Sequence, residues 1–256
     1  MPHLSIVIPA YNEEKRIGRT LEGTFEYLDA QKYESEVLVV NDGSSDHTAE
    51  KVREFAGRTN GRLRLIENPG NRGKGYAVRN GMLQARGEII LFYDADLATP
   101  TSEIAKVVEP IAKDRYDIVF GSRALNSDLI GVHQSFLREL RGRGGNLLLR
   151  LLLGLDFKDT QCGFKAFRLQ AAREIFAVQR IDGFGFDPEV LYIGQKQGWS
   201  LLETPVRWNH VEGSKVTLFA TTVKVLLEVL TIRLNDLKGK YDLVATSPNL
   251  KSEIER

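Results

Sequence analysis

The sequence has one cysteine, no long apolar run and almost no excess of charge, and each of these absences excludes a class of protein. With Cys162 alone, the chain has no internal disulfide. Charged residues interrupt its most apolar stretches, so none reaches the roughly 18 residues of a spanning helix. A net charge of +1 argues against a dedicated nucleic-acid-binding protein, which needs a strong basic excess. The opening MPHLSIVIPA contains no cationic leader before a long apolar segment, so we expect a cytoplasmic protein that does not itself cross a membrane.

What the chain does have is an alternation of short apolar segments and longer helix-like ones. Its 256 residues, 42% of them hydrophobic, suffice for one sizeable α/β core. Five segments have the composition of strands: 4–8, 36–40, 63–67, 89–93 and 117–120. Helix-like segments separate them, and this order predicts a mostly parallel, Rossmann-like sheet flanked by helices. No internal repeat or low-complexity linker interrupts the pattern, and we therefore expect a single domain.

A polar loop follows each of the five predicted strands. The loops read IPAYNEE, NDGSSD, NPGNRGKG, DADLATP and GSR. In a parallel sheet the carboxyl ends of the strands share one edge, and open α/β sheets bind their ligands there. All five loops would then converge on one site. Chance could easily produce one loop of functional composition, but it poorly explains five that each follow a strand of the same sheet.

Two carboxylates, Asp94 and Asp96, come directly after the fourth predicted strand. They repel each other unless a positive charge lies between them, and an oxygen-ligated divalent cation carrying a substrate diphosphate would supply it. The alternative is a solvated turn whose aspartates cap the next helix. The loop around Lys74 fits neither a Walker loop, because Gly75 follows the lysine, nor a dinucleotide fingerprint, because Val78 stands where Gly or Ala is needed.

The second half of the chain is less regular. It contains a nearly all-apolar stretch at 147–155, a polar break DTQCGF, a predicted helix around 188–197 and a predicted strand around 201–206. The tail at 245–256 is expected to be disordered.

The last predicted helix, at about 218–238, is amphipathic. Apolar residues lie at helical spacing on one face, beside Lys224 and Arg233: Val223, Leu226, Leu227, Leu230 and Leu234. This helix and the stretch at 147–155 favour peripheral binding to a membrane surface. Packing of both segments in the core is the alternative.

In chain order the sequence contains IPAYNEE, VVNDGSSD, NRGKG, DADLATP, GSRA, DTQCGFKAF, FDPEVLY and VEGSK. Together these motifs resemble the inverting glycosyltransferases of family 2, which have a GT-A fold. DTQCGFK, followed by FDPE and GSK, most resembles dolichyl-phosphate β-glucosyltransferases and their prokaryotic polyprenyl-phosphate relatives. The resemblance implies a GT-A domain over 1–240, with a nucleotide-sugar-binding half at 1–125 and an acceptor-binding half at 126–240. The eukaryotic relatives carry an N-terminal anchor and this chain begins at its first strand, so membrane attachment would be peripheral or through a partner.

The resemblance assigns the nucleotide-sugar donor to the first half. Pro9, Tyr11 and Glu13 would line the nucleotide pocket, with Asp42 accepting a hydrogen bond from the base. Lys74 would lie near the diphosphate. Packing, an Asx-turn and a solvated lysine are the purely structural alternatives for Tyr11, Asp42 and Lys74.

The metal and the acceptor have their own candidates. Asp94 would contact ribose or metal, and Asp96 would be the principal ligand of Mg²⁺ or Mn²⁺ and a catalytic residue. Arginine suits a phosphate through its paired donors, so the acceptor phosphate would meet a set of cations: Arg123, Arg138 and Lys215. Arg123 is also a catalytic candidate. Asp187 is another, although an acid at a helix start is favourable for dipole reasons alone.

The predicted reaction is transfer of a hexose, glucose from UDP-glucose, to a polyprenyl or dolichyl phosphate, with inversion to a β-linked product. The acceptor phosphate is already anionic near neutral pH and needs no strong base to attack. A GDP-mannose-dependent transferase is one alternative, weakened because related mannosyltransferases read DADLQ where this chain has Ala98. A non-catalytic nucleotide-sugar-binding protein is the other, and the intact DAD pair argues against it.

Overall fold

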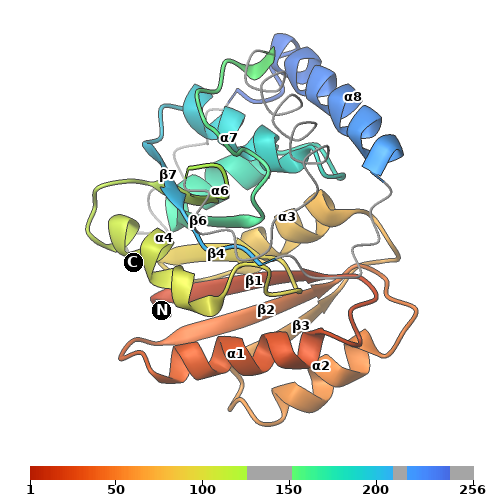
Figure 1. Cartoon of the computed structure of the whole chain (residues 1–256), viewed down its shortest axis with the longest axis vertical. Coiled ribbons are helices and arrows are strands. Elements are labelled where there is room, and N and C mark those ends of the chain that lie inside the picture. The colour runs from red at the N-terminus through yellow and green to blue at the C-terminus, as the bar shows by residue number, and fades with distance from the viewer. Residues whose placement is uncertain (126–151, 210–217, 243–256) are drawn as a thin grey trace, which may run out of the picture.

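The protein is built on one seven-stranded mixed sheet with helices on both faces (Figure 1). The structure, a computed structural model, describes residues 1–125, 152–209 and 218–242. The strand order is β3-β2-β1-β4-β6-β5-β7. Arg138, Lys215 and the tail at 245–256 lie outside the described residues, as does most of the apolar stretch at 147–155.

The first four strands are mutually parallel: β1 (Leu4–Ala10), β2 (Ser35–Asn41), β3 (Leu63–Glu67) and β4 (Ile89–Tyr93). β1, β2 and β4 are buried along their whole length, as near-continuous apolar runs in a parallel sheet should be. Their crossovers are α1 (Ile17–Asp29), α2 (Thr48–Ala56) and α3 (Lys74–Gln84). The predicted parallel sheet is confirmed here, and the loops after these strands lie at one edge.

The rest of the sheet departs from that pattern. β5 (Ile118–Ser122) and β7 (Leu201–Pro205) pair in parallel, close to where the sequence predicts strands. Between β4 and β5 lies β6 (Phe164–Arg168), which runs antiparallel to both. The sequence pattern did not predict β6, because its five residues include two cations.

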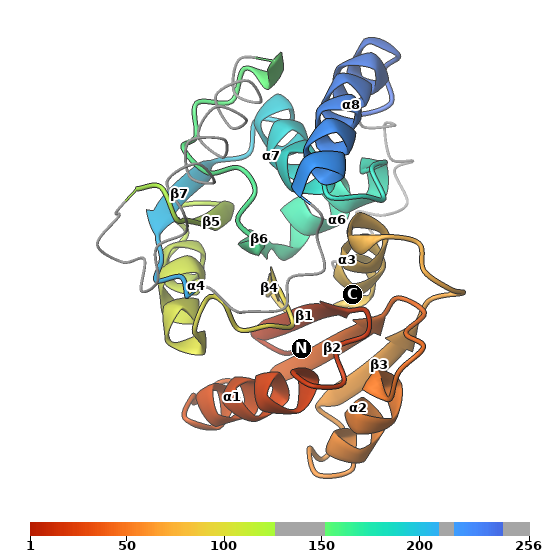
Figure 2. The same ribbon diagram turned by 45° about the vertical axis from the view of Figure 1, so that its right-hand side comes forward.

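Helices complete the two faces of the sheet (Figure 2). The first face is covered by α1, α2 and α4 (Ile104–Ala112), which follows a 3-10 turn, η1 (Thr101–Glu103). The second face is covered by α3, α6 (Leu169–Val178), α7 (Phe186–Lys196) and α8 (Leu218–Leu237). None of the helices in the described part of the chain is both long enough and apolar enough to cross a membrane.

Candidate active site

The loop after β4 is held in place from α1. The Tyr93 hydroxyl bonds that of Thr24, and the Thr20 hydroxyl donates to the carbonyl of Ala95 at 2.6 Å. Leu97 has a φ of 52°, a left-handed conformation that costs a leucine energy. It turns the chain so that the Ala98 N–H reaches Asp96 Oδ1 at 3.0 Å. The loop is therefore pre-shaped.

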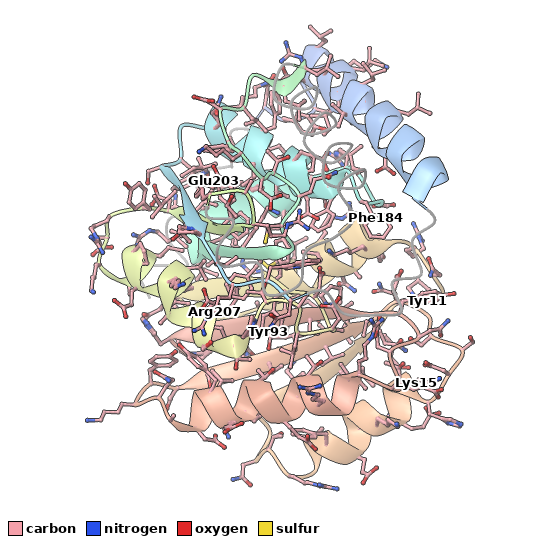
Figure 3. The ribbon with its side chains drawn as sticks, viewed as in Figure 1. Tyr11, Lys15, Tyr93, Phe184, Glu203 and Arg207 are labelled. Carbon is pink, nitrogen blue, oxygen red and sulfur yellow. The ribbon has the colours of Figure 1, made fainter. Side chains whose placement is uncertain are left out.

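Asp94 and Asp96 lie in a cleft at this edge of the sheet, with about 340 Å³ of space that is free of atoms and partly open to solvent. Both halves of the chain contribute to its lining: Tyr93, Asp94, Asp96, Ala98, Thr99, Arg123, Gln161, Cys162, Gly163 and Trp208. In Figure 3, Tyr93 lies in the interior of the molecule, whereas Tyr11 and Phe184 lie toward its edge. Tyr11 is 42% exposed, so its ring is accessible to a ligand rather than packed in the core.

Charges of alternating sign run from the cleft into the core. Lys74 Nζ lies 2.6 Å from Asp94 Oδ1 and 3.8 Å from Asp187 Oδ2. The other oxygen of Asp187 contacts the ammonium of Lys165, which is fully buried and also donates to the Cys162 carbonyl at 2.6 Å. Asp187 is 3% exposed and is not among the residues that line the cleft. Its carboxylate therefore lies behind Lys74, with both oxygens engaged by lysine side chains.

The pKa values of this chain of charges follow from burial and neighbours. Burial opposes the charged form of Lys74, but Asp94 and Asp187 outweigh it and raise the Lys74 pKa above its usual value. Burial raises the pKa of Asp187, against the opposing influence of Lys165 and Lys74. Burial and the charge of Asp94 together raise the pKa of Asp96. A divalent cation would reverse this last effect by favouring both ionised carboxylates.

The donor set fits a cation that arrives with its substrate. Within residues 1–125, 152–209 and 218–242, no group of three or more His, Cys, Asp or Glu side chains could hold a metal by itself. Asp94 and Asp96 supply two carboxylates, and Mg²⁺ is commonly bound through one or two carboxylates plus substrate phosphates and water. The residues present therefore suit a phosphate-bridging ion better than a permanent structural one.

Of the predicted nucleotide residues, Pro9 lies in β1, where it pairs with Val40, and Tyr11 and Glu13 follow that strand. Asp42 follows β2, and its N–H donates to the carbonyl of Ala10 at 2.9 Å. Asp42 is buried, and its carboxylate accepts bonds from Asn68 Nδ2 at 2.8 Å and from the N–H groups of Arg72 and Gly73 at 3.1 and 2.8 Å. This carboxylate shapes the loop that precedes Lys74. Its contact with a base remains a prediction.

Glu13 has a local partner. Its carboxylate accepts two bonds from Arg16, at 2.6 and 2.8 Å, and its N–H donates to Thr48. Arg16 precedes α1 directly, so this pair also fixes the start of that helix.

Arg123 reaches the cleft from the end of β5. Its guanidinium donates two hydrogen bonds to Asp159, from Nε to Oδ2 at 2.7 Å and from Nη2 to Oδ1 at 2.8 Å. Trp208 lies with its ring 5.8 Å from the Arg123 Cζ. Burial opposes the charge of Arg123, but Asp159 outweighs it and raises the Arg123 pKa. Of the three predicted acceptor cations, only Arg123 falls among the described residues.

Sequence reasoning missed several of the groups that the structure brings together: Asp159, Gln161, Lys165 and Trp208. DTQCGF was interpreted as a polar break, and the longer DTQCGFKAF served only as one of the motifs of the family resemblance. The signal that could have identified a strand is its alternation, with Phe164, Ala166 and Arg168 facing one way and Lys165 and Phe167 the other.

Comparisons with known proteins show the family of this chain. The family model described as glycosyl transferase family 2 matches residues 5–176. A dolichyl-phosphate β-glucosyltransferase of Trichomonas vaginalis is 40% identical over 239 residues, covering 90% of this chain and 72% of that protein. The Homo sapiens dolichyl-phosphate β-glucosyltransferase is 35% identical over 255 residues, covering 95% of this chain and 78% of that protein.

Solved structures show the same fold. Glucosyl-3-phosphoglycerate synthase from Mycobacterium tuberculosis, crystallised with Mn²⁺, UDP and phosphoglyceric acid, superposes with a TM-score of 0.66 at 19% identity. The match covers 90% of this chain and 78% of that one, and another structure of the same enzyme contains Mg²⁺ and UDP. The GT-A fold expected from the sequence is thereby confirmed. On sequence and fold together, the chain belongs to glycosyl transferase family 2.

Proposed function

We propose that this protein transfers glucose from UDP-glucose to a polyprenyl phosphate of the dolichyl type, with inversion to a β-linked lipid-phosphate sugar. One observation carries the proposal: a single cleft holds both the Asp94/Asp96 pair, suited to a metal-bound diphosphate, and Arg123, suited to a second phosphate. The names of the relatives described above supply the glucose and the dolichyl phosphate.

On the donor side, Asp96 and Asp94 would hold Mg²⁺ or Mn²⁺. When bound, the ion supplies positive charge against the diphosphate that leaves with the nucleotide. Lys74, whose raised pKa keeps it protonated, would add charge at the same end of the donor. Pro9, Tyr11, Glu13 and Asp42 belong to the strand ends and loops that would bind the nucleotide.

On the acceptor side, Arg123 would hold the lipid phosphate against the anomeric carbon. Asp159 fixes the guanidinium before the substrate arrives, so little reorganisation is needed during the reaction. A phosphate oxygen that is already ionised attacks without giving up a proton. Positioning and charge stabilisation then account for most of the rate.

A direct assay tests this assignment. The purified protein is incubated with Mn²⁺ or Mg²⁺, a short-chain polyprenyl phosphate and, in parallel, UDP-glucose or GDP-mannose. We expect turnover with UDP-glucose that EDTA abolishes, and a β-anomeric product by NMR. Faster transfer from GDP-mannose would replace the proposed donor, and transfer to a free sugar hydroxyl in preference to the lipid phosphate would replace the proposed acceptor.

The outward face of α8 supports peripheral membrane binding. Four leucines point away from the core along this face, with exposed fractions between 48% and 83%: Leu227, Leu230, Leu234 and Leu237. Val229 and Ile232, on the opposite face, are fully buried. By contrast, Leu153 and Leu155 of the other predicted segment pack in the core. We therefore propose that α8 makes the membrane contact, at the cytoplasmic face, and residues 147–151 of the other segment lie outside the described residues.

Vesicle flotation tests this part separately. Binding to vesicles of neutral and anionic phospholipid should fall in a Leu227→Ser/Leu230→Ser variant. Its unfolding midpoint should change no more than that of a protein with ordinary surface substitutions. If the wild-type protein stays in solution with both vesicle types, α8 does not contact lipid.

A further inference from the structure

A short segment, residues 180–185, leads from α6 into α7, whose first turn carries Asp187, and also contacts the first turn of α3, which carries Lys74. On one side, the carbonyl of Asp182 accepts the N–H groups of Gly75 at 2.8 Å and Tyr76 at 3.3 Å, which belong to the first turn of α3. On the other side, the segment leads through Gly185 into the first turn of α7. Displacement of this segment would therefore move Lys74 and Asp187 relative to each other.

The segment has no regular structure of its own, and carboxylates hold it from outside. Glu189 of α7 accepts the N–H groups of Arg180 at 3.0 Å and Ile181 at 2.9 Å. Its far end is held by α8, where Glu228 Oε2 accepts the N–H of Gly185 at 2.7 Å. Gly185 is the N-cap residue of α7, so Glu228 places negative charge at the positive end of that helix.

Glycines make this approach possible. A Cβ atom at Gly183 would clash with the Glu228 carboxylate, and one at Gly185 would lie 2.7 Å from the Glu228 Cβ. Across the segment, a Cβ at Gly73 or Gly75 would clash with the carbonyls of Asp182 or Ile181. The glycines on both sides of Lys74 and before Asp187 are thus explained by one packed unit that runs from α3 to α8.

We propose that Glu228 is a positioning residue for glycosyl transfer, acting from α8 through Gly185 on the placement of Lys74 and Asp187. The inference rests on the proposed function, in which Lys74 stabilises the leaving diphosphate. Figure 2 shows α3, α7 and α8 together on one side of the sheet. Reacting groups tolerate little displacement, since a misplacement of about 1 Å can cost on the order of 100-fold in rate.

The test compares three variants of the full chain. Glu228→Ala removes the acceptor for the Gly185 N–H, and Glu228→Gln keeps an acceptor oxygen at the same distance from the backbone. Asp236→Ala is the matched control, because Asp236 also joins α8 to α7, through Tyr192 and Lys196 at 2.5 Å each, but near the other end of α7. Two quantities are measured for each variant: kcat and KM with UDP-glucose, and amide hydrogen exchange in the peptides covering 73–77 and 180–186.

We expect Glu228→Ala to lower kcat about tenfold, with a donor KM within about threefold of the wild type, and to speed exchange in both peptides. Glu228→Gln should restore most of kcat and most of the protection from exchange. Asp236→Ala should change neither kcat nor exchange. Exchange in the Glu228→Ala protein that matches the wild type would overturn the inference. Equal losses of kcat in Glu228→Ala and Asp236→Ala would also overturn it, by reducing Glu228 to a general anchor of α8. If the wild-type protein does not use UDP-glucose, the proposed function fails, and the exchange data still decide whether Glu228 holds the segment.

Discussion

The cleft takes its residues from two parts of the sheet that differ in strand direction. In β1 to β4, all parallel, the interiors of the strands are apolar and the functional groups follow their carboxyl ends. β6 runs the other way, with Phe164 beside Tyr93. Its preceding loop, rather than its following one, therefore reaches the cleft edge. That loop supplies Asp159, Gln161 and Cys162.

The two parts also place their charges differently. Asp94 and Asp96 lie in the open cleft, whereas β6 carries Lys165 within the strand, fully buried against Asp187. An exposed charge is screened by water, but a buried one depends on its partner. Loss of Asp94 or Asp96 should therefore leave the fold intact and impair the chemistry. The antiparallel part should fail in stability first.

Lys165→Met should have the largest effect and sharpens this contrast most. The change leaves the buried Asp187 carboxylate without its closest cation, and breaking one partner of a buried pair typically costs about 3–5 kcal/mol. Urea unfolding measures the loss. Arg53→Met is the control, because its pair with Glu67 is half exposed and should be worth at most about 1 kcal/mol. Equal costs for the two variants would show that burial does not distinguish the regions.

Asp96→Asn should act on chemistry alone. We expect turnover to fall roughly 100- to 1,000-fold, the scale of removing one electrostatic contact to the transition state. The unfolding midpoint should stay near that of the wild type, because the Asn side-chain oxygen can still accept the Ala98 N–H. The variant should also bind Mn²⁺ more weakly in the presence of UDP, as measured by calorimetry. Near-normal activity of Asp96→Asn would remove the DAD loop from the mechanism. Asp29→Asn, on the surface, is the control for replacing an aspartate by an asparagine.

Glu103→Gln tests a contact between the two parts. Glu103, fully buried in η1, accepts bonds from Lys106 at 2.6 Å and from Arg207, after β7, through Nε at 2.9 Å. Burial opposes its charge, but these cations outweigh burial and lower the Glu103 pKa. The stabilisation is therefore present above the unfolded-state pKa of about 4.3 and is lost as pH falls through the lower folded-state pKa.

At pH 7 we expect Glu103→Gln to lose about 1–3 kcal/mol of the free energy of unfolding. The difference from the wild type should shrink below about pH 4. A difference independent of pH would mean that the carboxylate charge is not what joins the parts.

The same contrast explains how far the sequence alone could predict this protein. Asp94 and Asp96 were predicted because they follow a strand whose apolar run is visible locally, whereas Lys74 was predicted from the family resemblance. The pairing of β6 with β4 and β5 joins residues far apart in the chain, and no local pattern specifies it. The partners of Arg123 and Asp187 depend on that pairing, so Asp159 and Lys165 could not be assigned. For α8 the amphipathic pattern was visible, but only the packed structure shows which leucines point outward: Leu227, Leu230, Leu234 and Leu237.

The smallest expected effect concerns Asp187, and it decides whether the antiparallel part takes a direct part in the chemistry. If the acceptor were a sugar hydroxyl, a carboxylate would have to accept its proton, and losing that base should cost roughly 100- to 10,000-fold in rate. With a phosphate nucleophile no such loss is required. Asp187 contacts Lys165 and Lys74 and does not line the cleft, which favours a supporting role. We therefore expect Asp187→Asn to retain transfer within about tenfold of the wild type, in contrast to the cost of losing a general base.

The pH profile provides the second readout of the same experiment. The acidic limb should follow the second ionisation of the acceptor phosphate, near pKa 6 by analogy with phosphoserine, so that the rate rises with pH through this value. The limb should lie at the same pH in Asp187→Asn as in the wild type, because the titrating group belongs to the substrate. Saturating donor and metal keep a binding defect from being mistaken for lost chemistry. Complete inactivity of a folded Asp187→Asn protein that still binds both substrates would contradict base-free transfer, and the choice of a phosphate acceptor would then have to be abandoned.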